Sequence, residues 1–161
     1  MDKKLVKAFN EQIKDELYSA YLYLSMAAYF DSRNLAGFSH WMKVQFREET
    51  AHAMKIFDFL ADRGVRVALE AIEQPTKDFS SIQEVFSLTL GHEKKVTALI
   101  GKLYALAKES DDSAAAVFLQ WFINEQVEEE KSATAILETI KMSKSDPAAI
   151  IILDRELAKR Q

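Results

Sequence analysis

Six side chains of the kinds that bind metals recur at similar depths in four segments with a helical pattern. They are Glu16, Glu49, His52, Glu93, Gln126 and Glu129. With about 100° of rotation per residue, each falls inside a stripe that is otherwise apolar, as where Glu16 lies between Ile13 and Ala20. A buried carboxylate without a partner is costly and normally protonates, so several in one layer require a positive charge between them. A pair of metal ions is the simplest candidate.

The pattern Glu-x-x-His, formed by Glu49 and His52, directs two side chains one helical turn apart towards one point. Oxygen-rich coordination with a single imidazole favours iron or manganese, because zinc and copper sites generally have more nitrogen or sulfur. Two metals about 3.5 to 4 Å apart can share a carboxylate, and we expect Glu49 to be the bridge. The first position would hold Glu16, Glu49 and His52. The second would hold Glu49, Glu93 and Glu129, with Gln126 as a neutral ligand or a hydrogen-bond partner.

Composition predicts one all-α domain spanning residues 1–161. Forty-eight per cent apolar residues are enough to fill a core, and four Gly with two Pro leave few turns for a β-rich fold. A net charge of −4 with interspersed signs argues against a nucleic-acid groove. No cysteine is present for a disulfide or a cysteine-based metal site. The first residues lack the pattern of a signal peptide, so we expect a cytoplasmic protein that binds neither nucleic acid nor membrane.

The breakers divide the chain into four long helices, at about 3–31, 35–63, 82–109 and 113–143, and a short one at about 147–159. Gly64 suits a helix C′ position, and Ser81 with Glu84 resembles a capping box. Short links make the first and second helices antiparallel, and likewise the third and fourth. The segment 65–80 is long enough, at about 50 Å, to return along a helix of roughly 42 Å. The second and third helices would then be parallel, which is typical of ferritin-like four-helix bundles with one long crossover.

The chain resembles the bacterial non-haem ferritins over its full length. The resemblance rests on Glu16 with Tyr23, on Glu48-Glu49-Thr50-Ala51-His52, on Glu93, and on the segment from Asn124 to Glu130. It implies a ferroxidase that oxidises Fe(II) to Fe(III) with dioxygen or peroxide at a site for two iron ions. It also implies storage of the ferric mineral inside a shell of 24 subunits. Tyr23 would lie beside the site and assist electron transfer, although it can equally be a core residue.

Departures from related families narrow the prediction. Bacterioferritins and rubrerythrins have a second Glu-x-x-His where this chain has Gln126-Val127-Glu128-Glu129. Bacterioferritins also place a haem-binding Met where this chain has Thr50, so no haem is expected. Animal ferritins have carboxylates in a three-fold iron channel at positions that are Ala116 and Leu119 here, which leaves that route for iron in doubt.

A third iron position is predicted beside the pair. Its candidate ligands, which flank the site-facing stripes, are Glu48, Glu125, Glu128 and Glu129. The alternative is that Glu128 and Glu130 belong to a solvated acidic run. His40 and His92 lie off the ligand stripes and are expected at the surface.

The tail predicts assembly. Asp146 and Pro147 are typical of a helix start, and Ile150, Leu153 and Leu157 form an apolar strip that Ile151 and Ile152 widen. We expect this strip to be buried against other subunits, the alternative being that it packs on its own bundle.

Two other functions remain open at this point. One is a structural bundle whose acidic residues pair with Lys94, Lys95 or Lys131. The other is a dimeric di-iron oxidase or peroxidase.

Overall fold

The computed structural model describes residues 1–161 and contains five helices and no strand. They are α1 (Lys3–Ser32), α2 (Ala36–Asp62), α3 (Ile82–Glu109), α4 (Ser113–Ser143) and α5 (Pro147–Leu157). The bounds predicted for α3 and α4 are confirmed at both ends. Helix α1 ends one residue later than predicted, α2 is one residue shorter at each end, and α5 ends two residues early. The all-α prediction, with four long helices and one short one, is confirmed.

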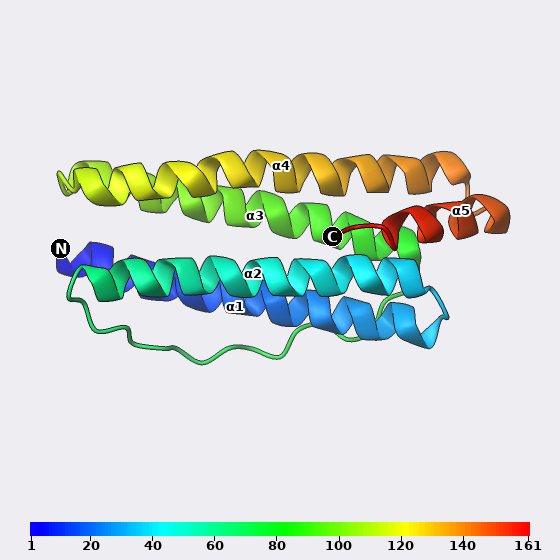
Figure 1. The fold of residues 1–161 in the computed structure, drawn as a ribbon, viewed down its shortest axis with the longest axis horizontal. Helices are drawn as coiled ribbons and strands as arrows, with labels where there is room; N and C mark the ends of the chain where they lie inside the picture. Colours follow the sequence, from blue (N-terminus) through cyan, green and yellow to red (C-terminus); the bar gives the residue numbers. More distant parts are fainter.

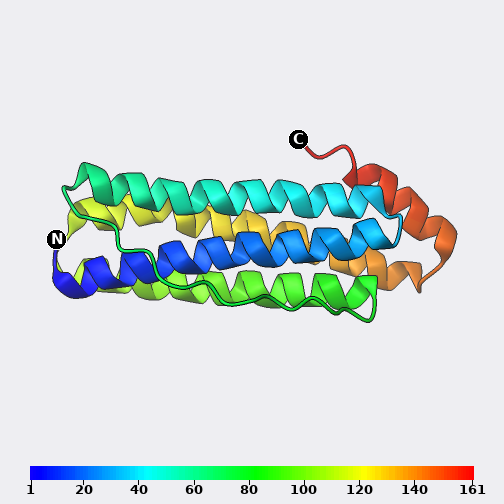
Figure 2. The same cartoon turned by 90° about the horizontal axis from the view of Figure 1, so that it is seen from below.

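The long helices form two antiparallel pairs, α1 with α2 and α3 with α4 (Figure 1). The crossover runs the length of the bundle along its outer side, so α3 starts at the same end as α2 and runs parallel to it (Figures 1 and 2). Two hydrogen bonds tie the crossover to α1: the Ala68 amide donates to Asn10 Oδ1 at 2.8 Å, and the Ser25 hydroxyl donates to the Thr76 carbonyl at 2.7 Å. The predicted topology is confirmed.

Local sequence explains most of the helix ends. Asp2 and Asp112 accept hydrogen bonds from the first turns of α1 and α4, and Gly64 follows α2 with φ of 68°. Ser81 caps α3 by accepting from the Glu84 amide at 3.0 Å. The Glu84 carboxylate, however, accepts from the Ser80 hydroxyl at 2.7 Å, so the reciprocal half of the predicted capping box is displaced by one residue.

The interior consists of two apolar clusters, one towards each end of the bundle. One contains Phe9, Ile56 and Leu119, and the other contains Phe30, Phe38 and Phe86. Between them lies the layer that holds the predicted ligands. Ala116 and Leu119 are themselves buried inside this chain's own bundle, with 7% and 0% exposure.

Helix α5 packs against the start of α2, where the backbone of Asp154 lies next to Gly37. A Cβ at Gly37 would be 1.6 Å from the Asp154 carbonyl oxygen, so only glycine permits this approach. The Asp154 side chain accepts from the Phe38 amide at 2.9 Å, and α2 has no cap from its own N-cap residue. An acidic side chain from α5 thus satisfies an amide that the start of α2 leaves open.

The predicted burial of the tail against other subunits is wrong for part of its apolar strip. Leu157 is buried, and Ile150 and Leu153 pack against the core of their own bundle. Ile151 and Ile152 point away from it, with 51% and 63% exposure. The strip is therefore divided between a docking face and a free face.

Replacing Gly37 with Ala tests the docking of α5. Because the new Cβ would overlap the Asp154 backbone, we expect α5 to move away and α2 to lose its cap, at a cost of at least about 1 kcal/mol in the free energy of unfolding. Hydrogen exchange should become faster in α5 and in the first turn of α2. Gly101→Ala is the matched control, because no atom lies within 4 Å of its Cβ position, and it should stabilise slightly. Equal exchange in both variants would contradict the docking geometry.

Candidate metal centre

The structure brings all six predicted ligands into one central layer. They are Glu16 from α1, Glu49 and His52 from α2, Glu93 from α3, and Gln126 and Glu129 from α4. Their exposed fractions are between 1% and 5%. The ligands meet there because each lies near the middle of its helix and because the crossover sets α3 parallel to α2.

His52 lies between two groups of carboxylates. Atoms of Glu16, Glu49 and His52 lie within 4.8 Å of one another, and so do atoms of His52, Glu125 and Glu129. His52 Nδ1 is 3.6 Å from Glu49 Oε2 and 4.0 Å from Glu16 Oε2. The first group matches the predicted first metal position, while the second group was not predicted with His52 as a member. In both groups the ligand atoms are close enough together to hold a metal ion.

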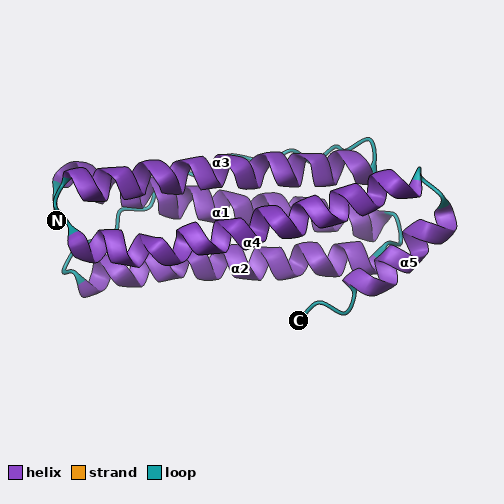
Figure 3. Ribbon diagram, turned by 90° about the horizontal axis from the view of Figure 1, so that it is seen from above, coloured by secondary structure: helices purple, strands orange, loops and turns teal.

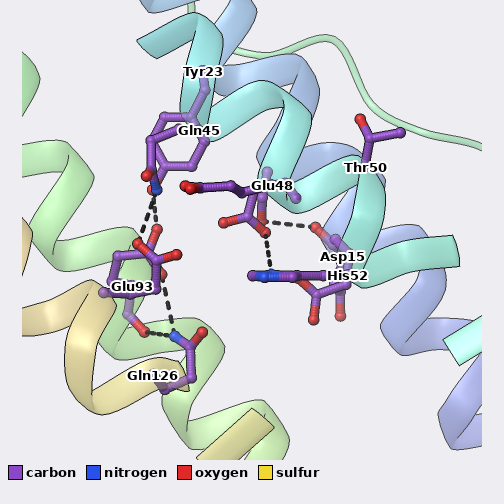
Figure 4. A network of polar contacts seen from close by, with 12 residues as sticks. Asp15, Tyr23, Gln45, Glu48, Thr50, His52, Glu93 and Gln126 are labelled. Carbon is purple, nitrogen blue, oxygen red and sulfur yellow. Dashed lines mark hydrogen bonds and ion pairs between the residues drawn. The ribbon is translucent and has the colours of Figure 1, made fainter. Parts of the chain in front are cut away.

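Three amide side chains hold the carboxylates in place. Gln12 donates to Glu16 at 2.9 Å, and Gln45 donates to Glu129 at 3.0 Å. Gln126 donates to the Glu93 carboxylate at 3.1 Å, which is the hydrogen-bonding alternative considered for it. Figure 4 shows Glu93 between Tyr23 and Gln126, where the Tyr23 hydroxyl also donates to Glu93.

Sequence reasoning missed Gln12 and Gln45 as residues that position ligands. A signal was available: Gln12 precedes Glu16 by four residues, and Gln45 precedes Glu49 by four, so both share the ligand stripes.

Acidic side chains gather in this layer without a lysine side chain to compensate them. One oxygen each of Glu16 and Glu49 is buried and has no hydrogen-bond partner. Burial raises the pKa of Glu16, Glu49 and Glu93, and it raises the pKa of Glu129 to about 7. Lys94, Lys95 and Lys131 are all exposed, so none enters the layer. This excludes the alternative in which lysines neutralise the acidic residues of a purely structural bundle.

On the α1–α3 side of the layer, Tyr23 contacts Glu93 and His92 contacts Tyr23. Tyr23 is fully buried, and its pKa is raised by burial and by the neighbouring Glu93. The His92 ring lies edge-on to Tyr23 at 6.2 Å, and its Nε2 is 2.7 Å from the Ser19 hydroxyl. Burial lowers the pKa of His92 to about 4.

The expectation of two surface histidines is wrong. His92 is half-buried among these residues, and the half-buried His40 donates to the Arg160 carbonyl at 2.7 Å.

The four outer carboxylates do not assemble as predicted. Glu125 and Glu129 lie together beside His52. Glu128 is instead exposed and pairs with Lys131 at 3.0 Å, as the solvated alternative requires. Glu48 is half-buried and pairs with Arg160 at 2.5 Å.

The family model for the ferritin-like domain matches residues 6–143, which contain every predicted ligand. The chain belongs to the ferritin family. Bacterial non-heme ferritins are among its relatives: that of Staphylococcus epidermidis is 37% identical over 99% of this chain and 96% of the relative, and that of Staphylococcus aureus is 35% identical over the same shares.

Solved ferritin structures match even more closely in sequence. An open pore ferritin of the archaeon Archaeoglobus fulgidus is 49% identical, with a TM-score of 0.99 over 100% of this chain and 99% of that one. An engineered closed form of that ferritin is 50% identical, with a TM-score of 0.98 over 100% and 98%. Iron storage is the function of this family, and the buried acidic layer suits it. No helix of this ferritin is both long and apolar enough to span a membrane.

The pKa of Glu129 leads to a prediction for the metal-free protein. The folded state holds a proton on Glu129 up to about pH 7, whereas the ordinary glutamate pKa is 4.5. Glu129 therefore contributes to the free energy of unfolding in full below about pH 4.5. This contribution, on the order of 3 kcal/mol, is lost as the pH rises through 7. Glu129→Gln should remove it: the variant should gain stability over the wild type at pH 8 and little at pH 5, as measured by thermal unfolding after chelation. An equal difference at both pH values would contradict this.

Proposed function

We propose that this ferritin is a ferroxidase that binds two Fe(II) ions in the central layer and oxidises them to Fe(III). The observation that supports this most is the burial of Glu16, Glu49, Glu93 and Glu129 in one layer. Three of them lie close to His52, and no lysine side chain enters the layer. Such a layer is costly to fold empty and becomes favourable with divalent cations in it. Hard oxygen donors with one nitrogen suit iron.

Glu16, Glu49 and His52 would bind the first ion. Glu93 and Glu129 would bind the second, and Glu49 would bridge the two ions with its unpartnered oxygen. The three glutamines keep these carboxylates oriented, as second-layer partners do in metal sites. Gln126 acts through Glu93 in this assignment and need not itself contact iron.

Proton release accompanies binding, because a ligand must be deprotonated to bind a metal. The carboxyl groups whose pKa is raised by burial release their protons when Fe(II) arrives. Each Fe(II) then gives one electron to the oxidant. Dioxygen that accepts two electrons and two protons leaves as hydrogen peroxide, and peroxide that accepts two of each leaves as water. Tyr23, hydrogen-bonded to Glu93, would assist electron transfer from beside the site.

A third iron position would lie at the edge of the layer. Its proposed ligands are Glu48, Glu125 and Glu129, which leaves Glu128 in the solvated ion pair with Lys131. Fe(III) would pass this position on its way to the mineral. No haem is required by any of these steps.

A cytoplasmic shell of 24 subunits is the proposed assembly. The exposed Ile151 and Ile152 supply an apolar contact that the monomer leaves uncovered. A dimeric di-iron oxidase or peroxidase is the competing proposal, and the particle mass distinguishes the two. Light scattering of the purified protein should give about 24 times the subunit mass of 18.3 kDa.

Glu49→Ala tests the proposed bridge. Because both ions lose a ligand, we expect the initial rate of Fe(II) oxidation to fall by more than about tenfold, measured by stopped-flow absorbance after mixing with oxygen. The fold should remain intact, since removing a carboxylate also relieves repulsion in the layer. Glu128→Ala is the control with an exposed glutamate and should keep the wild-type rate. A wild-type rate in Glu49→Ala would sink the bridge assignment.

The double variant Ile151→Ser/Ile152→Ser tests the shell contact. These side chains do not dock on their own bundle, so helical content and the oxidation rate should be retained while the particle dissociates into smaller species on dilution. Leu157→Ala makes the opposite test, because its buried side chain packs on the bundle and its loss should lower subunit stability first. An unchanged particle mass for the double variant at all concentrations argues against this interface.

A further inference from the structure

The C-terminal segment, made of α5 and the residues after it, runs back beside α2 and ends part-way along the bundle (Figures 2 and 3). Its contacts follow one stripe of α2, on which Gly37, Trp41 and Glu48 are spaced i, i+4 and i+11. Asp154 meets the stripe at Gly37, and Arg160 meets it at Trp41 and Glu48. The last residues therefore lie between the end of the bundle and the edge of the metal centre.

Arg160 is held at three points. Its guanidinium lies over the Trp41 ring at 4.5 Å from the centroid, its Nη2 is 2.5 Å from Glu48 Oε2, and its backbone carbonyl accepts from His40. The side chain is only 23% exposed. Stacking on an aromatic face and backbone anchoring reduce the freedom that an ordinary surface ion pair would lose on forming.

One part of this guanidinium is not satisfied within the subunit. Arg160 Nη1 is buried and has no hydrogen-bond partner. An unpaired buried donor is costly, so Arg160 is not at this position for the stability of the ion pair alone.

Glu48 is the residue through which this contact reaches the metal centre. It is adjacent in sequence to Glu49, and its charge contributes to raising the pKa of both Glu49 and Glu129. The guanidinium occupies Glu48 Oε2, and a metal ion on the same carboxylate would be repelled by its positive charge.

We propose that Arg160 is a built-in counter-ion that competes with iron for Glu48 and thereby keeps the third position weak. This inference rests on the proposed function, because it assigns regulation to the outer iron position. A weakly held ion moves on, so the contact favours passage of iron rather than its retention at the edge of the layer. By linkage, an ion at this position must also loosen the C-terminal segment by the same factor.

Anaerobic titration calorimetry with Fe(II) tests the competition without any turnover. The wild type should bind two ions tightly and a third more weakly. Arg160→Ala should tighten the third ion about 5- to 10-fold and leave the first two unchanged. Lys159→Ala removes the same charge from the neighbouring residue, which is exposed and pairs only with Glu156, and it should change nothing.

Two further variants locate the effect. Glu48→Gln should abolish the third ion, and adding it to Arg160→Ala should remove the gain, because the gain requires that carboxylate. Hydrogen exchange gives an independent readout: saturating Fe(II) should speed exchange in residues 158–161 of the wild type but not of Glu48→Gln.

The outcomes separate the two proposals. If the wild type does not bind two Fe(II) ions tightly, the ferroxidase assignment is overturned. If the pair binds but the third ion is unaffected or weakened in Arg160→Ala, or is tightened equally in Lys159→Ala, the competition is disproved. It is equally disproved if no variant binds a third ion.

Discussion

The rest of the structure depends on the cost of removing four carboxylates from water in a single layer. Glu16, Glu49, Glu93 and Glu129 are almost completely buried, and two of their oxygens have no partner. A core of this length could be filled entirely with apolar side chains, as its two ends are. The layer interrupts that core at the height where the ligand side chains of the four helices meet. The bundle therefore gives up apolar packing at its centre, and the two apolar ends must supply the stability that this centre lacks until cations occupy it.

Hydrogen bonds hold most of the carboxylates of this layer in fixed positions, although no basic side chain compensates them. Glutamines from three helices fix one oxygen of Glu16, Glu93 and Glu129, and Tyr23 fixes Glu93 from the other side. Glu49 is the exception among the four, because no amide holds it. A bridging ligand has to serve two ions at once, so freedom at Glu49 and order at the other three are what a paired site requires.

Sequence alone predicted the features that local chemistry determines. Helices α3 and α4 begin where expected because Ser81 and Asp112 cap them from adjacent positions, and the ligand layer follows from the helical period. What it missed depends on partners far along the chain. The contact of Glu48 with Arg160 spans 112 residues, and Gly37 looks unremarkable until the Asp154 backbone lies against it. His92 lies off the ligand stripe but is half-buried because α1 brings Ser19 and Tyr23 against it.

The C-terminal segment then connects two properties that the sequence presents as separate. Its one face docks on α2 through Asp154 and Leu157, its other face exposes Ile151 and Ile152, and its last residues place Arg160 on Glu48. Because these features follow one another along one short segment, a neighbouring subunit that covered the exposed isoleucines would also fix the helix from which Arg160 extends. In the proposed shell, order between subunits and charge at the edge of the metal centre would thus be coupled through one segment, so a change that frees α5 should act on both.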